Sequence, residues 1–256
     1  MISLEIDDGV ARVTIDRPAV LNALDETSEN ELIEIWERLE DDRSVFLAIL
    51  TGAGDKAFCV GADLHAPGRT GLDYWAKLSK GGMGGIATGS RLTVPVLARV
   101  NGYALGGGFE MVIGCDLAVA AEEATFGFSE PLVGRLALAG GVIQLPRMTT
   151  RKRAMELLLT ARRISAVEAL EFGLVNQVVP RASLDEAVEE WIGRLRACAP
   201  LTLRAIKQMV TETAPMSVSE AMAHRSEAMV VAIQSEDADE GVLAFNEHRP
   251  PRWQGK

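Results

Sequence analysis

Short apolar strands that run into glycine-led turns recur along the first half of the chain, and this recurrence limits the possible folds most. The strand-like residues 95–100 precede Gly106-Gly107-Gly108, and residues 46–50 precede a turn led by Gly61. Apolar residues at helical spacing occur between such runs, so strand, strand and helix alternate. The alternation predicts an α/β body of repeated ββα units rather than a pure β-sandwich.

Hydrophobic spacing and turn residues place the individual elements. Residues 2–6 and 10–15 alternate around Asp7-Asp8-Gly9 and predict a hairpin, and residues 25–42 carry apolar side chains at helical spacing. The elements expected next are a strand at 45–51, a helix at 72–78, a strand at 95–100, a short helix at 107–114, a strand at 116–120 and a return strand at 125–128.

The chain becomes mostly helical after residue 150. Three Ser-x-x-Glu sequences, which start at Ser165, Ser183 and Ser217, predict capping boxes at helix N-termini. Only residues 174–179 are expected to form a strand there. We therefore expect a core at residues 1–195 and, at residues 196–256, an Ala- and Met-rich helical region that packs on the core or on a neighbouring subunit.

Composition excludes several classes of protein. Of the 256 residues, 48% are apolar, which is ample for a buried core, and the net charge of −10 argues against a nucleic-acid-binding surface. No apolar segment resembles a signal peptide or is long enough to span a bilayer. Cys59, Cys115 and Cys198 fit neither a disulfide framework nor a zinc site, so we expect buried thiols in a cytoplasmic protein.

A glutamate beside the glycine-rich turn is the first candidate for catalysis. Glu110 lies in an otherwise apolar segment, and burying a carboxylate is unfavourable unless it is paired or takes part in chemistry. Alternatively, Glu110 faces water in the first turn of a helix, where the dipole favours it. The glycines before it either bring free N–H groups close to an oxyanion or simply allow a tight strand-to-helix turn, and these two interpretations are compatible.

Glu130 becomes a second candidate because of its position along the chain. Taken alone, Ser129-Glu130-Pro131 predicts a solvated turn. Between Glu110 and Glu130, however, lie a helix, a strand, a turn and a return strand, so a reversal of the chain would bring the two carboxylates together. Two carboxylates that share one water form a coupled acid–base pair.

Other chemistries fit the sequence poorly. Gly82-x-Gly84-x-x-Ala87 matches a loose dinucleotide-binding pattern but follows a helical segment, which favours a flexible loop. Gly127-x-Ser129-x-Pro131 lacks the last glycine of a nucleophile elbow. The histidines show no metal-ligand spacing, and no metal site is expected.

Four sequence blocks, in this order, resemble those of the crotonase (enoyl-CoA hydratase/isomerase) superfamily, and the resemblance extends from Arg17 to the C-terminal tail. The blocks are Asp16-Arg17-Pro18-x-x-Leu21-Asn22-Ala23-Leu24, Ala57-Phe58-Cys59-Val60-Gly61-Ala62-Asp63-Leu64, Val100-Asn101-Gly102-Tyr103-Ala104-Leu105-Gly106-Gly107-Gly108, and Ile164-Ser165-Ala166 through Gly173-Leu174-Val175. The resemblance implies a spiral of ββα units with a helical C-terminal region, assembled as trimers that pair into hexamers.

The resemblance also implies a site for an acyl-CoA thioester. Glu110 and Glu130 correspond to the two carboxylates of hydratases, and the backbone N–H groups of Ala62 and Gly107 correspond to an oxyanion hole. The residues implied in substrate binding are Arg17, Ala19, Val60, Gly61, Asp63, Leu64, Gly106 and Leu138. Coenzyme A is part of the substrate, and no further cofactor is expected.

Several positions depart from the pattern of the superfamily. Ala19 and His65 stand where basic residues near the CoA phosphates are common, which leaves Arg17 as one candidate for a phosphate contact. Leu138 lies in a segment that reads Pro-Gly-x-Gly-Gly in the superfamily, so an unusual acyl group is plausible. Residues 66–89 are rich in glycine and are expected to be the most mobile part of the pocket, covering the acyl chain.

Both hydratase glutamates are present, and this favours an enoyl-CoA hydratase of fatty acid metabolism that adds water across the 2,3 double bond or removes it. The alternatives are an isomerase that uses one carboxylate, a hydratase or dehydratase for an unusual acyl-CoA, and a non-catalytic acyl-CoA-binding protein. The acidic composition argues against the RNA-binding role of some relatives.

Overall fold

Two β-sheets built mostly of parallel strands form the centre of the protein in the computed structural model, which describes residues 1–65, 81–89 and 92–256. The larger sheet has the order β1-β2-β3-β5-β7-β10, in which β1 and β2 form an antiparallel hairpin and the other pairs are parallel. Its strands are β1 (Ile2–Asp7), β2 (Val10–Ile15), β3 (Leu47–Gly52), β5 (Val96–Val100), β7 (Leu117–Ala121) and β10 (Gln177–Val179).

The smaller sheet carries the short strands that lead into the glycine turns. It has the order β4-β6-β8-β9, and only the β8–β9 pair is antiparallel. Its strands are β4 (Ala57–Cys59), β6 (Tyr103–Leu105), β8 (Thr125–Gly127) and β9 (Ile164–Ser165). The predicted α/β body of parallel strands and helices is confirmed, although the two-residue strand β9 was not predicted, because two residues carry no alternation.

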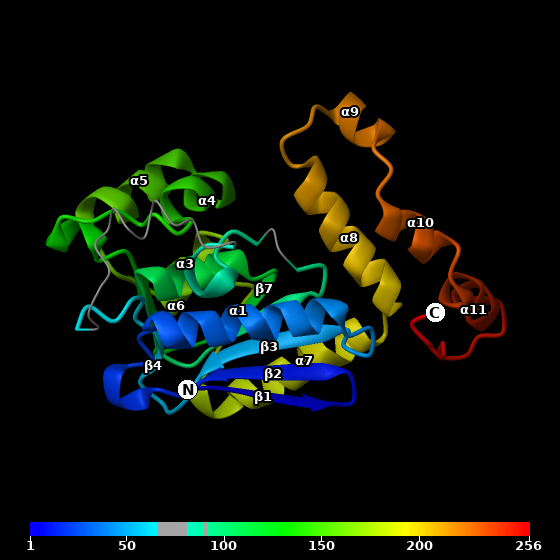
Figure 1. The fold of residues 1–256 in the computed structure, drawn as a ribbon, viewed down its shortest axis with the longest axis horizontal. Helices are drawn as coiled ribbons and strands as arrows, with labels where there is room; N and C mark the ends of the chain where they lie inside the picture. Colours follow the sequence, from blue (N-terminus) through cyan, green and yellow to red (C-terminus); the bar gives the residue numbers. More distant parts are fainter. Residues whose placement is uncertain (66–80, 90–91) are drawn as a thin grey trace.

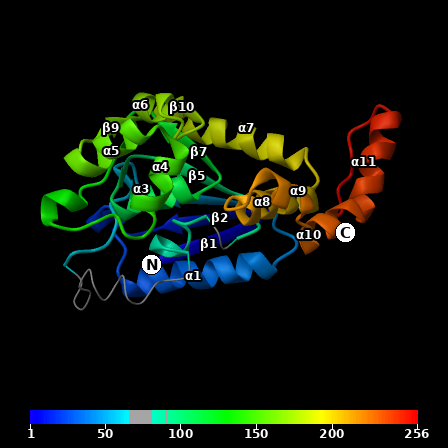
Figure 2. The ribbon, with the colours of Figure 1, turned by 90° about the horizontal axis from the view of Figure 1, so that it is seen from above.

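Helices cover both faces of the larger sheet, as Figure 2 shows with α1 on one side and α7 on the other. Helix α1 (Glu26–Asp41) begins where the Asp25 carboxylate accepts the Ser28 N–H, and it buries Leu32, Trp36 and Leu39. Helix α7 (Leu184–Arg196) buries an apolar stripe against the opposite face. A strand covered on both faces needs a continuous apolar run, which explains the sequence Leu-Ala-Ile-Leu at the start of β3.

The remaining helices surround the smaller sheet or link the layers. They are the short turns η1 (Pro18–Val20), η2 (Met83–Gly85), η3 (Glu130–Val133) and η4 (Arg181–Ser183), and the helices α3 (Gly107–Gly114), α4 (Gly141–Met148), α5 (Arg151–Thr160) and α6 (Ala166–Glu171). Every residue of α3 is buried. The expected helix at 72–78 lies outside the described residues.

Four C-terminal helices extend away from the sheets, on the side where α7 ends (Figure 1). They are α8 (Pro200–Thr213), α9 (Val218–Ala223), α10 (Glu227–Ile233) and α11 (Glu236–Asn246). Only a small apolar cluster holds α8 and α10 together, formed by Leu201, Ala205 and Ala232. Within the described part of the chain, no helix combines the length and apolarity needed to cross a membrane.

Two of the three predicted capping boxes are confirmed. Ser165 and Ser217 each accept the N3 backbone N–H, and the glutamate at N3 accepts the serine N–H in return. The prediction at Ser183 is wrong: this residue ends the turn η4 with φ −101° and ψ 5°, and its side chain makes no cap bond. Ser226 and Ser235 cap α10 and α11 without a glutamate at N3, which is why the motif did not reveal them.

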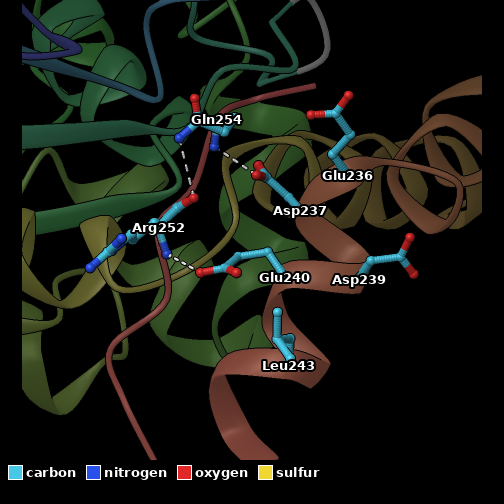
Figure 3. A pocket seen from close by; sticks show the side chains of 7 residues that line it. All are labelled: Glu236, Asp237, Asp239, Glu240, Leu243, Arg252 and Gln254. Atoms are coloured by element: carbon cyan, nitrogen blue, oxygen red, sulfur yellow. Dashed lines mark hydrogen bonds between the residues drawn. The ribbon is translucent and has the colours of Figure 1, made fainter. Parts of the chain in front are cut away.

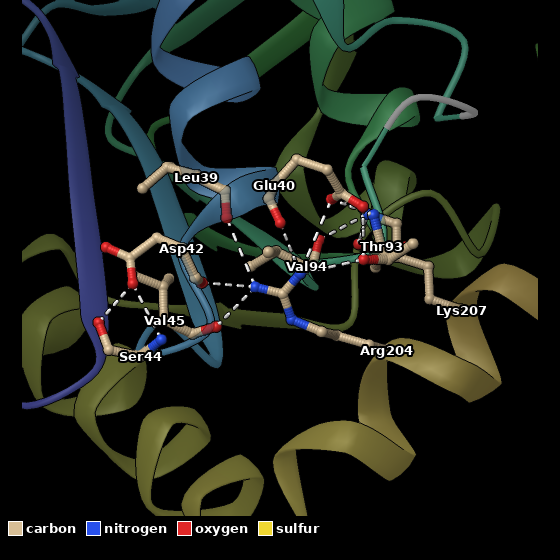
Figure 4. Close-up of polar contacts among 10 residues, drawn as sticks. Leu39, Glu40, Asp42, Ser44, Val45, Thr93, Val94, Arg204 and Lys207 are labelled. Carbon is tan, nitrogen blue, oxygen red and sulfur yellow. Dashed lines mark hydrogen bonds and ion pairs between the residues drawn. The ribbon is translucent and has the colours of Figure 1, made fainter. Parts of the chain in front are cut away.

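The C-terminal helices are fastened to the core by two cations on α8 (Figure 4). The Arg204 guanidinium donates to the carbonyl oxygens at and just beyond the C-terminal end of α1: Leu39, Glu40, Asp42 and Val45. One turn further, Lys207 donates to Val94 O at 2.9 Å and to Asp116 Oδ2 at 2.6 Å. The last carbonyls of a helix have no partner within it, so Arg204 satisfies groups that would otherwise stay unbonded in a partly buried place.

Replacing this cation should loosen the helical region. We expect Arg204→Met to lower the free energy of unfolding by about 2–4 kcal/mol, because several carbonyl oxygens lose their donor where water reaches poorly. Urea unfolding followed by circular dichroism measures the loss, and hydrogen exchange should show faster exchange in α8. Arg12→Met is the matched control, since Arg12 pairs with Glu189 at an exposed site. Equal stability of the two variants would contradict the role of Arg204.

Candidate active site

Glu110 is a buried carboxylate in the first turns of α3. Only 3% of the residue is exposed, so the interpretation that it faces water is wrong. Its Oε1 accepts the Gly141 N–H at 2.8 Å, and this N–H is the first of helix α4. A helix N-terminus stabilises an oxygen that carries negative charge. The carboxylate is therefore held in a fixed orientation inside the protein.

Glycine is required where the chain approaches this carboxylate. Gly140 has φ 148°, which other residues rarely adopt. A Cβ atom on Gly141 would stand 2.8 Å from Phe128 Cε1 and 3.1 Å from Glu110 Oε1. The two glycines therefore permit the close contact between the start of α4 and Glu110. In the sequence they are the last two residues of the segment that reads Pro-Gly-x-Gly-Gly in the superfamily.

Glu130 follows strand β8 of the smaller sheet and lies against the Gly106 turn that precedes α3. It opens η3 directly after β8, and a Cβ on Gly106 would stand 3.1 Å from Glu130 Oε1. Its Oε2 is buried and has no hydrogen-bond partner within the described part of the chain. The structure thus brings Glu130 to the turn from which Glu110 projects, through the predicted return of the chain along β7 and β8.

Burial changes the protonation of both glutamates. It raises the pKa of Glu110 to about 7, against a lowering effect of the Gly141 N–H and a further raising effect of the Glu130 charge. Burial also raises the pKa of Glu130. Because the two carboxyls influence each other, one can hold a proton while the other is ionised near neutral pH.

The two turns implied in the oxyanion hole are in contact. Leu24 N–H donates to Gly61 O and Asp63 N–H donates to Leu24 O, both at 2.8 Å, so the intervening Ala62 N–H points away from Leu24. A Cβ on Gly61 would stand 2.9 Å from Gly107 N, which is the first N–H of α3. Among the described residues, neither the Ala62 N–H nor the Gly107 N–H donates a hydrogen bond. Two available donors therefore lie on adjoining turns beside the glutamates.

Two asparagines, whose role the sequence did not reveal, hold the connection from β3 to β4, which leads to the Ala62 turn. Asn22 Nδ2 donates to Ala57 O at 2.7 Å, and Asn101 Nδ2 donates to Gly52 O at 2.9 Å and to Gly54 O at 2.7 Å. Both asparagines are buried within apolar blocks of the sequence. Most buried amide groups find such partners, and this rule was the signal available in the sequence, although the Asn101 Oδ1 atom has no partner among the described residues.

The residues expected to bind substrate differ in how close they lie to the glutamates and in how exposed they are. Gly61, Asp63 and Gly106 lie at the contact between the turns, beside the catalytic candidates. Val60 and Leu138 are half-buried, whereas Ala19 and Leu64 are exposed, so the last two can touch only a ligand that lies along the surface.

Arg17, the candidate for a phosphate contact, is engaged with other groups of the protein. Its guanidinium donates to Ala23 O and lies 2.7 Å from Asp25 Oδ2 and 3.5 Å from Asp63 Oδ2. With only 19% of its side chain exposed and two carboxylates beside it, Arg17 is neutralised within the protein.

The glycine cluster at 81–85 is a packed turn rather than the flexible loop expected from its sequence. Trp36 Nε1 donates to Gly84 O at 2.7 Å, and a Cβ on Gly82 would stand 2.0 Å from Ala139 O. These glycines allow close backbone contact beneath the loop that leads to Gly141. The rest of the expected lid, residues 66–80, lies outside the described residues.

Among the described residues, the C-terminal tail and α11 line an open hollow of about 510 Å³ (Figure 3), and α11 lies far from α3, the helix that carries Glu110 (Figures 1 and 2). Two of its four carboxylates bind the tail: Asp237 accepts the N–H groups of Gln254 and Gly255, and Glu240 accepts that of Arg252. This acidic hollow would repel the phosphates of coenzyme A, and it fastens the tail instead. The described part of the chain also shows no group of three or more side chains that could hold a metal ion.

The three cysteine thiols differ in their exposure to solvent. Cys59 and Cys115 are buried, and burial raises the pKa of Cys59 to about 12. Cys198 is exposed, so the expectation of a buried thiol is wrong there; it lies between α7 and α8, where no core forms over it.

This arrangement of sheets and helices is the crotonase fold. The structure matches a crystal structure of an enoyl-CoA hydratase from Bacillus anthracis with a TM-score of 0.90, at 34% sequence identity over 100% of this chain and 99% of the other. The family model described as enoyl-CoA hydratase/isomerase matches residues 5–256, and the chain belongs to that family.

Two curated relatives are similar along their whole length. One is (E)-benzylidenesuccinyl-CoA hydratase from Thauera aromatica, 37% identical over 99% of both chains. Another is carnitinyl-CoA dehydratase from Escherichia coli strain K12, 37% identical over 100% of this chain and 98% of the relative.

The buried carboxyl of Glu110 should make stability depend on pH. The folded pKa of about 7 lies above the ordinary value of 4.5, so the folded state keeps a proton that the unfolded state releases, and stability falls as pH rises from 4.5 to 7. Glu110→Gln removes this loss while its amide oxygen can still accept the Gly141 N–H. We expect the variant to exceed the wild type in unfolding free energy by about 2–3 kcal/mol at pH 8 and to match it near pH 5.

Urea unfolding at the two pH values measures this difference. Glu5→Gln, at an exposed position of β1, serves as the control and should change neither value. A Glu110→Gln variant with the wild-type pH dependence would show that the Glu110 carboxyl is not perturbed by burial.

Proposed function

We propose that the protein catalyses the addition of water across the 2,3 double bond of a 2-enoyl-CoA thioester, or the reverse dehydration. The observation that carries the proposal is a pair of carboxyls near the Gly106 turn: the buried Glu110, on the helix that this turn starts, and Glu130, whose Oε2 atom is buried and whose Oε1 atom lies beside Gly106. Burying two such groups is unfavourable unless chemistry requires it, and this argues against a protein that only binds acyl-CoA. Membership of the enoyl-CoA hydratase/isomerase family supports the same class of reaction.

In the proposed mechanism, the thioester carbonyl accepts hydrogen bonds from the Ala62 and Gly107 N–H groups. Negative charge that develops on this oxygen is stabilised there, and one such donor can contribute about 3 kcal/mol to the transition state. Ala62 and Gly107 supply these donors from backbone that is already fixed by the Leu24 bridge and by the start of α3. No side chain has to reorganise during the reaction.

The two glutamates move the protons. Glu110 takes a proton from the water whose oxygen bonds to C3, and Glu130 delivers a proton to C2 of the enolate. The reaction requires one carboxylate and one carboxylic acid at the same time, and raised pKa values make that combination accessible near neutral pH. The opposite assignment of the two roles uses the same geometry. Acid–base chemistry of this kind needs no metal or redox cofactor, and coenzyme A enters as part of the substrate.

The proposal does not specify the acyl group of the substrate. The curated relatives are named for two different acyl groups, benzylidenesuccinyl and carnitinyl, and for hydration in one case and dehydration in the other. Leu138 lies half-buried one residue before Ala139 and three before Gly141, so it can line the pocket beside the reacting water. A panel of short, long, branched and aromatic enoyl-CoA thioesters therefore tests the function directly.

We further propose a cytoplasmic role in fatty acid metabolism, since acidic composition and dispersed thiols suit that compartment.

Neutral replacement of either glutamate should abolish most of the activity. We expect Glu110→Gln and Glu130→Gln each to lower kcat by about 10²–10⁴-fold while coenzyme A still binds, because each residue transfers one proton. Steady-state hydration assays and calorimetry with free coenzyme A measure the two effects. If Glu130→Gln kept near-wild-type hydration while Glu110→Gln did not, the two-carboxylate mechanism would be wrong. Double-bond migration without hydration would favour the isomerase.

The protein should assemble as a trimer or hexamer. Large apolar side chains are exposed on η3, on the loop after it, on α4 and on the C-terminal helices, among them Leu132, Leu136, Ile143, Val210, Met222 and Phe245. So much exposed apolar surface is typical of a subunit interface. Light scattering should give a mass of three or six times the 27.5 kDa chain, and a stable monomer at micromolar concentration would contradict the expectation.

A further inference from the structure

Arg17 joins the two chain segments that form the Ala62 turn. Through Asp63 it contacts the residue after Ala62, and through Ala23 O and Asp25 it contacts both neighbours of Leu24. Leu24 is the residue that pairs with Ala62. One guanidinium thus connects both sides of the bridge that fixes the direction of the Ala62 N–H.

The backbone of Arg17 is equally fixed, so the guanidinium acts from a rigid base. Its N–H donates to Asn22 Oδ1 at 3.0 Å, and its carbonyl oxygen accepts the Asn22 N–H at 2.9 Å. Asn22 is in turn bound to Ala57 O at the start of β4. Arg17 is therefore positioned by the smaller sheet and transmits that position to the turn.

The electrostatics of the group also exclude a role as a free phosphate-binding cation. Asp25 and Asp63 both contact the same terminal nitrogen of Arg17, so one positive charge faces two negative ones. A phosphate approaching this site would meet a net negative field. If the guanidinium were absent, the two carboxylates would repel each other and push the turn away from Leu24.

We propose that Arg17 is a positioning residue for the oxyanion-hole donor Ala62 N–H, rather than a ligand for the phosphates of coenzyme A. This inference rests on the proposed function, because it assigns Arg17 a part in polarising the thioester carbonyl. It acts on the transition state through Asp63 and the Leu24 bridge, without touching the substrate.

Two variants test the proposal. Arg17→Met removes the charge and the donors at similar length, and Asp63→Asn removes one carboxylate at constant size. A small displacement of a catalytic group can lower the rate by about 100-fold, so we expect kcat to fall roughly 10- to 100-fold in each variant. Affinity for free coenzyme A, which has no acyl carbonyl, should not change. Arg12→Met, at an exposed ion pair, is the control for loss of an arginine and should retain wild-type values.

The combination of the two variants gives a sharper result. If Arg17 acts through Asp63, the double variant should be no slower than the slower single variant. If Arg17 instead bound phosphate, Asp63→Asn would release it and tighten the binding of free coenzyme A, and Arg17→Met would weaken that binding at constant kcat. Either of these two changes overturns the proposal, and so does the absence of any effect on kcat.

A spectroscopic measurement separates the position of the donor from turnover. Cinnamoyl-CoA is a conjugated 2-enoyl thioester whose absorption band moves to longer wavelength when its carbonyl is polarised by hydrogen bonds. In a Glu110→Gln background, which blocks the chemistry, addition of Arg17→Met or Asp63→Asn should reduce this shift, and Arg17→Lys should restore part of it. An undiminished shift overturns the proposal.

These outcomes are distinct from failure of the proposed function. A wild-type protein that hydrates no enoyl-CoA would defeat the proposed function, while the band shift of bound cinnamoyl-CoA would still report on Arg17. If Arg17→Met does not fold, Asp63→Asn carries the test alone, since it preserves volume and one acceptor oxygen. Its kcat and its band shift must then both decrease.

Discussion

Placing two carboxyl groups beside one glycine turn, away from water, is the constraint on which the site depends. Burial raises the pKa of Glu110 to about 7 in spite of the Gly141 N–H, so protonated and ionised forms of this carboxyl are both populated near neutral pH. The surrounding backbone must come close enough to exclude water, and only glycine permits that approach at Gly82, Gly106 and Gly141. The glycines at positions 106 and 141 are thus a consequence of where the two acids lie.

Polar contacts, rather than apolar surface, determine how the C-terminal helices meet the core. The cluster between α8 and α10 is small, whereas Arg204 and Lys207 bind backbone oxygens and Asp116. A buried cation with several acceptors requires one geometry, because any shift of the helix breaks several bonds together. The direction in which α8 leaves the core is therefore fixed by two side chains.

Sequence patterns predicted the fold well and the site in part. The apolar strands, the α1 stripe and the position of Glu130 relative to Glu110 follow from local periodicity and from a simple reversal of the chain. The Ser183 cap was predicted wrongly because Ser183 is the last residue of the turn η4. The glycine turn at 81–85 was predicted wrongly because tertiary contacts with Trp36 and the Ala139 carbonyl fix its conformation. The partners of Arg17 lie up to 46 residues away, beyond any local pattern.

The anchor of α8 also sets an order of events during synthesis. Arg204 binds the carbonyl of Asp42, which is 162 residues earlier in the chain, and the last strand of the larger sheet, β10, ends at Val179. The strands of the described part of the chain therefore leave the ribosome before this arginine does, and the sheets can assemble around α1 with its C-terminal carbonyls still hydrated. The helical region then docks onto a prepared surface, so a nascent chain that has emerged from the ribosome as far as residue 200 contains all the strands of both sheets but leaves the surface that α8 covers exposed.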